Sequence, residues 1–93
     1  LKPDYAAALN NRGQLHLWLA EYDDAIADLT RADTLNPDNA IILANRGRAY
    51  NKARRFDLAL QDLNRAVKLN PNGYRPWQRA KLPAARRHRA GGA

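Results

Sequence analysis

The chain has 93 residues, of which 45% are hydrophobic, and it contains neither cysteine nor methionine. This length allows one small domain with a modest core, and the absence of cysteine excludes disulfides and thiolate metal sites while leaving the compartment open. No apolar run approaches the ~18 residues that span a bilayer, and no signal-peptide pattern opens the chain. We therefore expect a soluble protein without membrane contact, with the cytoplasm as the default location.

The net charge of +7 is unevenly distributed. Residues 3–36 carry two basic and six acidic residues, for −4, whereas residues 37–70 carry seven basic and three acidic residues, for +4. Residues 71–93 carry six basic residues and no acid. The basic character therefore belongs to the C-terminal segment, and the opposite charges of the two central segments favour electrostatic contacts with partners or with other copies of the chain.

Residues 3–36 are predicted to form two helices. The first runs from about Asp4 to Trp18, and Asp4, which follows a proline, is expected to accept a hydrogen bond from a helix-start N–H. The second has apolar residues at three- and four-residue steps, namely Tyr22, Ala25, Ile26, Leu29 and Ala32. Asp23 and Asp24 fall in its first turn, where a carboxylate complements the partial positive charge of the helix start. We interpret these acids in this way and not as metal ligands.

Residues 37–70 repeat this pattern with a period of 34. Sliding residues 3–36 onto them gives 15 identities in 34 positions, including shared Asn-Arg-Gly, Asp-Leu, Arg-Ala and Leu-Asn steps. A first helix is predicted from about Asp38 to Lys52, opened by Pro-Asp as before. The apolar residues of the second helix are Phe56, Ala59, Leu60, Leu63 and Ala66.

Glycine recurs inside both predicted first helices, at Gly13 and Gly47. Glycine in a helix interior costs about 1 kcal/mol relative to alanine, so a packing reason is expected. We expect that the missing Cβ lets the second helix of each hairpin approach closely, with the small side chains of Ala25 and Ala59 facing the glycines.

Residues 71–82 begin a third unit but do not complete it. Pro71 continues the spacing of 34, but Lys81 stands at the glycine position and Pro83 interrupts the helix. A short helix from about residue 74 to residue 82 is predicted to cover the exposed face of the second unit. We therefore expect one domain over residues 1–82, divided into 3–36, 37–70 and a partial or capping unit at 71–82, and a basic flexible tail at 83–93.

These residues resemble the tetratricopeptide repeat (TPR) signature, here carried by Leu9, Gly13, Ala25, Leu29, Ala32 and Pro37 and by Leu43, Gly47, Tyr50, Ala59, Leu63, Ala66 and Pro71, with Trp77 at the large-aromatic position of the third unit. The resemblance implies an all-α fold in which antiparallel helix-turn-helix repeats stack as a short right-handed α-solenoid, with two full repeats and a partial third or capping helix. Repeat one has His16 where the family usually has Tyr. Both repeats carry Arg, as Arg12 and Arg46, where Leu is common.

Nothing in the sequence indicates catalysis. There is no serine, Thr30 and Thr34 have no histidine at helical spacing, and no glycine-rich phosphate loop occurs. The two histidines are His16 and His88, and His16 takes a position that the repeat uses for packing. We therefore expect a protein-binding scaffold without enzymatic activity, cofactor or metal, in which His16 lies in the core or in a groove wall.

The TPR resemblance implies a concave face lined by the first helices, on which extended segments bind. The lining residues would be Ala7, Asn10, Gln14 and Leu17 in repeat one and Ile41, Ala44, Arg48 and Asn51 in repeat two. Amides can bond both donors and acceptors of a peptide backbone, and arginine can hold a carboxylate by two parallel bonds, so this face suits an extended acidic peptide. Trp18, whose counterpart is Lys52, is expected to cover an edge or to line this groove.

Some TPR domains that bind chaperone tails use a carboxylate clamp of Lys, Asn and Arg side chains, and the resemblance transfers it only in part. Asn45 and Arg79 match clamp positions in type, and Arg75 keeps the charge of a Lys. Gln14 replaces an Asn, and Asn10 replaces a Lys with loss of its charge. Generic groove amides therefore stay open as the alternative. The predicted peptide-binding residues are Asn10, Gln14, Asn45, Arg48, Arg75 and Arg79.

Two other functions stay open. Nucleic-acid or acidic-surface binding through the basic C-terminal segment is disfavoured, because a short basic tail is usually only solvated. Self-association is the other, since each hairpin leaves an apolar face for a neighbour, and we predict a dimer or higher assembly at high concentration. The chain starts without Met, and Leu1 to Asp4 resemble the end of a preceding repeat, so upstream repeats in a longer parent are the alternative cover for that face.

Overall fold

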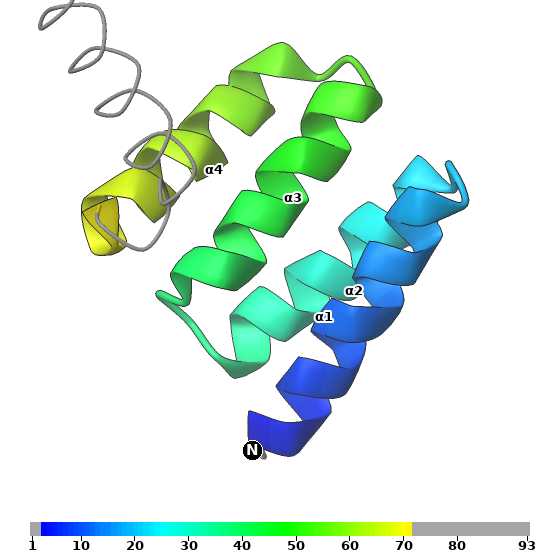
Figure 1. Ribbon diagram of the computed structural model, residues 1–93, viewed down its shortest axis with the longest axis horizontal. Helices are drawn as coiled ribbons and strands as arrows, with labels where there is room; N and C mark the ends of the chain where they lie inside the picture. The colour runs from blue at the N-terminus through cyan, green and yellow to red at the C-terminus, as the bar shows by residue number, and fades with distance from the viewer. Residues whose placement is uncertain (1–2, 72–93) are drawn as a thin grey trace, which may run out of the picture.

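The computed structural model describes residues 3–71, and four α-helices lie within them (Figure 1): α1 (Pro3–Trp18), α2 (Tyr22–Leu35), α3 (Ala40–Lys52) and α4 (Phe56–Leu69). The helices form two antiparallel hairpins, α1 with α2 and α3 with α4, and the hairpins stack through α2 and α3. The described part contains no strand, so the predicted all-α fold of stacked hairpins is confirmed. The predicted third helix and the basic tail lie outside the described residues.

No helix in this part of the chain is long and apolar enough to cross a membrane. The longest, α1, has 16 residues. A spanning helix needs about 20 predominantly apolar residues.

The two hairpin turns share one backbone geometry although neither contains glycine. Ala20 and Arg54, which are 34 residues apart, adopt left-handed φ angles of 64° and 67°. In the first turn the N–H of Glu21 donates to the carbonyl of His16 at 2.8 Å, and the N–H of Ala20 donates to the carbonyl of Leu17 at 3.0 Å. The second turn has the equivalent two bonds. This Schellman pattern satisfies carbonyls that the end of a helix leaves unpaired, and it brings the side chains of its first and last residues together.

The start of α3 differs from the prediction. The helix begins at Ala40 and its cap is Asn39, whose side-chain oxygen accepts hydrogen bonds from the N–H groups of Ile41 (2.9 Å) and Ile42 (3.1 Å). Asp38 has a φ of 61° and lies in the preceding turn, where its carboxylate pairs with Arg65. The capping role predicted for Asp38 is therefore wrong, because the left-handed backbone at that residue places it outside the helix. The first-turn positions predicted for Asp23 and Asp24 are confirmed, and Asp57, the counterpart of Asp23, lies in the first turn of α4.

The centre of the core lies between α2 and α3. Leu29 is fully buried and packs with Ala25 of its own helix and Ala49 of α3, and Leu17 and Ile26 complete this cluster. Two further clusters continue the core along the stack, with buried members Leu9, Ala32 and Ile42 in one and Leu43, Ala44 and Ala66 in the other. Each cluster joins residues of both repeats or of both helices of one hairpin.

Each helix-interior glycine lies close to the second helix of its own hairpin, Gly13 to α2 and Gly47 to α4. A Cβ added to Gly13 would be 2.7 Å from Leu29 Cγ, and one added to Gly47 would be 2.7 Å from Leu63 Cγ. The predicted close approach is confirmed, but the facing side chains are leucines and not the predicted alanines. Ala25 and Ala59 contribute their backbone carbonyl oxygens, 3.4 and 3.3 Å from the same points.

Candidate functional site

A hollow of about 540 Å³ opens where the last turns of α1 and α3 lie beside the start of α2. Its lining residues are Gln14, Leu17, Trp18, Ala20, Tyr22, Arg48 and Lys52. Two cations, one amide and two aromatic rings therefore share one concave surface, which offers both charge and apolar contact.

The 34-residue period explains how this surface is built. Gln14 and Arg48 occupy the same position of successive first helices, and so do Trp18 and Lys52 at the helix ends. Because the two hairpins stack in register, equivalent positions lie next to each other across the hollow. Trp18 is 85% exposed and lines the hollow, although its large apolar ring would gain from being covered.

Two of the predicted binding residues are bonded to each other. Asn45 Nδ2 donates to Asn10 Oδ1 at 3.0 Å, which ties α3 to α1, and Asn45 is only 4% exposed. Of the predicted set, the hollow thus brings together Gln14 and Arg48, while Asn10 and Asn45 link the two first helices. Arg75 and Arg79 lie outside the described residues.

Arg12 and Arg46, which stand where Leu is common in TPR sequences, are hydrogen-bonded to buried aspartates. Arg12 Nε and Nη2 donate to Asp28 at 2.7 and 2.9 Å, and Arg46 makes the equivalent pair of bonds to Asp62 at 2.7 and 3.0 Å. These bonds hold the pKa of Asp28 below its usual value and raise the pKa of both arginines. These two guanidinium groups therefore hold each hairpin together and are engaged away from the hollow.

These ion pairs were not predicted, although the sequence carries a signal for them. Arg and Asp recur together in both repeats, 16 residues apart. A charged side chain on the packing side of a helix is costly to bury unless an opposite charge pairs with it. The second pair is extended further. Arg46 Nη1 also lies 3.7 Å from Asp33 Oδ2 and donates to Thr30 Oγ1 at 3.4 Å, both on α2, so Arg46 links the two repeats.

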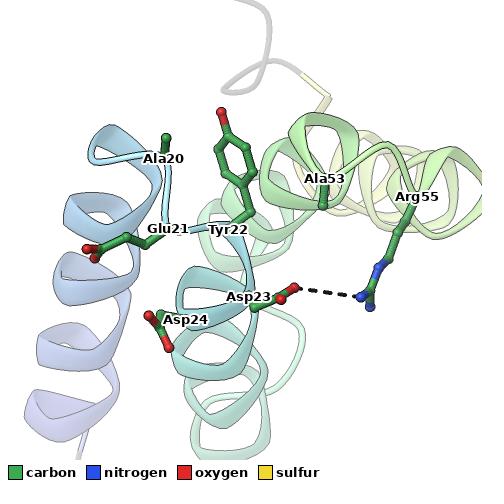
Figure 2. A pocket seen from close by; sticks show the side chains of 7 residues that line it. All are labelled: Ala20, Glu21, Tyr22, Asp23, Asp24, Ala53 and Arg55. Carbon is green, nitrogen blue, oxygen red and sulfur yellow. Dashed lines mark ion pairs between the residues drawn. The ribbon is translucent and has the colours of Figure 1, made fainter.

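A second hollow, of about 570 Å³, lies at the ends of the hairpins (Figure 2). Asp23 faces Arg55 of the other repeat, with Oδ1 and Nη2 3.6 Å apart. Glu21 and Asp24 point to the opposite side of α2, toward α1. His16 lies at this turn, half-buried, with its Nδ1 2.7 Å from Glu21 Oε1. It is outside the three hydrophobic clusters and does not line the hollow at Trp18.

Comparison with known proteins agrees with this architecture. Two family models, each described as tetratricopeptide repeat, match residues 6–39 and 40–72. Among solved structures the chain is similar to one described as the first TPR of Spaghetti (RPAP3) bound to the HSP90 peptide SRMEEVD, with a TM-score of 0.73 and 30% identity. The match covers 77% of this chain and 57% of that one, so the chain spans a little over half of the other's length. No curated protein matches the chain.

Proposed function

The chain belongs to the tetratricopeptide repeat family and is a protein-interaction scaffold, and we propose that it binds an extended acidic peptide segment in the hollow between α1 and α3. The observation that carries the proposal is that Arg48 and Lys52 meet the exposed ring of Trp18 on one concave surface. This surface is formed by the first helices of both repeats, which is the face on which solenoids of this kind bind extended segments.

The groups that line the hollow fit the parts of such a peptide. The guanidinium of Arg48 can hold a carboxylate by two parallel hydrogen bonds, and Lys52 adds a second positive charge. The amide of Gln14 can bond a peptide N–H or carbonyl, and the indole of Trp18 can cover an apolar side chain. Charge and apolar contact would therefore act on neighbouring residues of one bound segment.

The solved TPR structure supports the acidic character of the ligand. The peptide named in its description, SRMEEVD, has three acidic residues, and that domain is 30% identical to this chain. Because Asn45 is largely covered and bonded to Asn10, we place recognition at Arg48 and Lys52 and not at a complete carboxylate clamp. Arg75 and Arg79 stay in the proposed binding set on the basis of the sequence.

Calorimetric titration with acidic peptides tests this proposal. One seven-residue acidic peptide would be used with a free carboxylate and with a C-terminal amide, against the wild type, Arg48→Ala and Arg31→Ala. Arg31 is the control because it carries the same charge on α2 and does not line the hollow. We expect Arg48→Ala to weaken binding by about tenfold or more, since a hydrogen-bonded charge pair is lost, and Arg31→Ala to have little effect.

Three outcomes of this titration count against the proposal. Equal losses for both variants would mean that only net charge attracts the peptide. Absence of binding by the wild type would exclude the acidic ligand. A preference for the free carboxylate that is lost in Arg79→Ala but unaffected by Arg48→Ala would move recognition from this hollow to the clamp position.

Self-association is a second candidate, supported by one face of α1. Leu15 is 57% exposed there, whereas its counterpart in α3, Ala49, is fully buried by repeat one. We propose a second copy as the occupant, because repeat one carries −4 and repeat two carries +4, so copies attract each other head to tail. Sedimentation velocity should detect dimers near millimolar concentration that Leu15→Glu abolishes. A wild-type chain that stays monomeric near millimolar concentration would contradict self-association.

A further inference from the structure

Three side chains with metal-ligating atoms converge at the turn between α1 and α2. One ligand atom each from His16, Glu21 and Asp24 lies within 4.8 Å of the other two. The closest pair is His16 Nδ1 and Glu21 Oε1, at 2.7 Å. An imidazole and two carboxylates are thus gathered at one end of the first hairpin, outside the hollow proposed for peptide binding.

The backbone itself brings these three positions together. His16 and Glu21 are the first and last residues of the Schellman pattern, whose side chains regularly meet. Glu21 is also the N-cap residue of α2, and the side chain of Asp24, three residues later, can reach back to the cap. The site therefore needs no rearrangement of the backbone, only rotation of two exposed carboxylates.

The fold does not require any of the three side chains. In repeat two, which has the same turn geometry, the counterparts are Tyr50, Arg55 and Leu58. Glu21 makes no side-chain hydrogen bond that would cap α2. The two repeats therefore differ at all three positions, and repeat one carries a potential metal ligand at each of them.

A further carboxylate lies near the other ring nitrogen of His16. Nε2 of His16 lies 3.6 Å from Asp28 Oδ2, and Arg12 holds that carboxylate in place with two hydrogen bonds. Without a metal ion Nδ1 donates to Glu21 Oε1, because an ionised carboxylate can only accept a hydrogen bond. A bound metal ion would replace that proton on Nδ1, and the proton of the ring would then lie on Nε2, beside Asp28. Metal-binding histidines usually have such a partner.

We propose that His16, Glu21 and Asp24 bind a zinc ion, with water completing the coordination. One imidazole and two carboxylates with an open position is a donor set that zinc accepts, whereas calcium and magnesium prefer oxygen ligands alone. The start of α2 opposes a cation with a partial charge of about +0.5, but the two carboxylates contribute −2. This proposal replaces the helix-start interpretation for Asp24 only. Asp23 faces Arg55 on the other side of α2 (Figure 2).

Calorimetry and NMR with zinc chloride test the site on the full chain. We expect one equivalent to bind, with an affinity weakened by about tenfold or more in His16→Tyr and in Glu21→Gln. Asp23→Asn is the matched control for Asp24→Asn, because the change is identical one residue away, and His88→Ala controls for the other histidine. The His16→Tyr variant should fold, since Tyr50 occupies the equivalent position in repeat two.

The imidazole signals give a readout that folding differences do not mimic. Zinc should shift the ring resonances of His16 and leave those of His88 in place. The proposal is overturned if the His88 signals alone shift, if Asp23→Asn weakens binding as much as Asp24→Asn, or if the wild type shows neither heat nor a His16 shift at millimolar zinc. If His16→Tyr does not fold, the zinc affinity of Glu21→Gln and the shift of the His16 signals in the wild type decide whether the site exists.

Discussion

The first helices of the two repeats carry the same pattern but differ in what covers it. In α3 one face, formed by Ile42, Asn45, Arg46 and Ala49, is packed against repeat one, whereas the equivalent face of α1, formed by Ala8, Asn11, Arg12 and Leu15, is exposed. The arginine side chains show the difference clearly, with Arg12 62% exposed and Arg46 16% exposed. Burial in this fold is therefore decided by the neighbouring repeat more than by the sequence of the helix itself.

The second helices show the reverse arrangement. Leu29 of α2 is enclosed by α3, while its counterpart Leu63 is only half-buried on α4. Phe56 and Leu60 on α4 are exposed, although their counterparts in repeat one, Tyr22 and Ile26, are half-buried. The described stack is thus best packed in the middle, between α2 and α3, and open at both ends. Equivalent substitutions in the two repeats should measure this gradient.

The largest difference is expected for the two leucines. Leu29→Ala should lower the free energy of unfolding by about 3 kcal/mol or more, because it empties a fully enclosed position and the surrounding helices cannot collapse into it. Leu63→Ala should cost clearly less, since a half-buried side chain loses fewer contacts. Urea unfolding followed by circular dichroism measures both, and a chain this small has little stability to lose.

This pair also tests the sequence prediction for residues 71–82. If a helix from about residue 74 to residue 82 covers α4, Leu63→Ala becomes nearly as costly as Leu29→Ala, and removing residues 72–93 abolishes the extra cost. Equal costs that survive the truncation would show that α4 is enclosed by something else, such as a second copy.

The next effect concerns the buried ion pairs. Arg46→Leu should cost about 2 kcal/mol, because it leaves the buried carboxylate of Asp62 without its two hydrogen bonds and removes a link to Asp33. Arg12→Leu should cost less, since Arg12 is exposed and solvent screens its charge. The double variant Arg46→Leu/Asp62→Leu should recover most of the loss. A double variant no more stable than Arg46→Leu would contradict this account.

The repeat architecture could be predicted from the sequence because its signals are local and occur twice. Helix periodicity, the glycines inside first helices and the period of 34 each needed only neighbouring residues or a comparison of the two units. The cap of α3 could not be predicted in this way, because Asp38 and Asn39 are both good cap residues and the choice depends on the left-handed backbone of Asp38 in the turn between the hairpins.

The candidate sites were harder to predict, because they depend on contacts between elements. Helical spacing alone predicts that Gln14 and Arg48 line the concave face. That Lys52 lies beside Trp18 in the hollow depends on the register of the stacked hairpins. The cluster at His16 depends on the turn between α1 and α2, which adopts Schellman geometry although Ala20, and not a glycine, has the left-handed backbone. Sequence periodicity identifies faces of helices, whereas these sites lie where helices end.

A smaller difference is expected for the two glycines. Alanine improves helix propensity by about 1 kcal/mol at either position, but its Cβ would press against Leu29 or Leu63 at 2.7 Å. Leu29 is enclosed and cannot move away, so Gly13→Ala should cost about 1 kcal/mol net, whereas the half-buried Leu63 can rotate outward and Gly47→Ala should be near neutral. Thermal unfolding compares them. If Gly47→Ala lowers the stability as much as Gly13→Ala does, Leu63 on α4 is held as tightly as Leu29 at the interface between α2 and α3.

The smallest expected effect is the acid dependence contributed by Asp28. Its pKa is lowered in the folded chain, chiefly by the hydrogen bonds from Arg12, so folding favours the ionised carboxylate. This stability is present above the ordinary aspartate pKa of 3.8 and is lost as the pH falls through the lower folded value. Asp28→Asn should therefore be less stable at pH 7 and should lose less free energy of unfolding between pH 6 and pH 3. Because Arg12 is exposed, the difference should shrink in 0.5 M salt, and a salt-independent difference would show that the hydrogen bonds act without the charge.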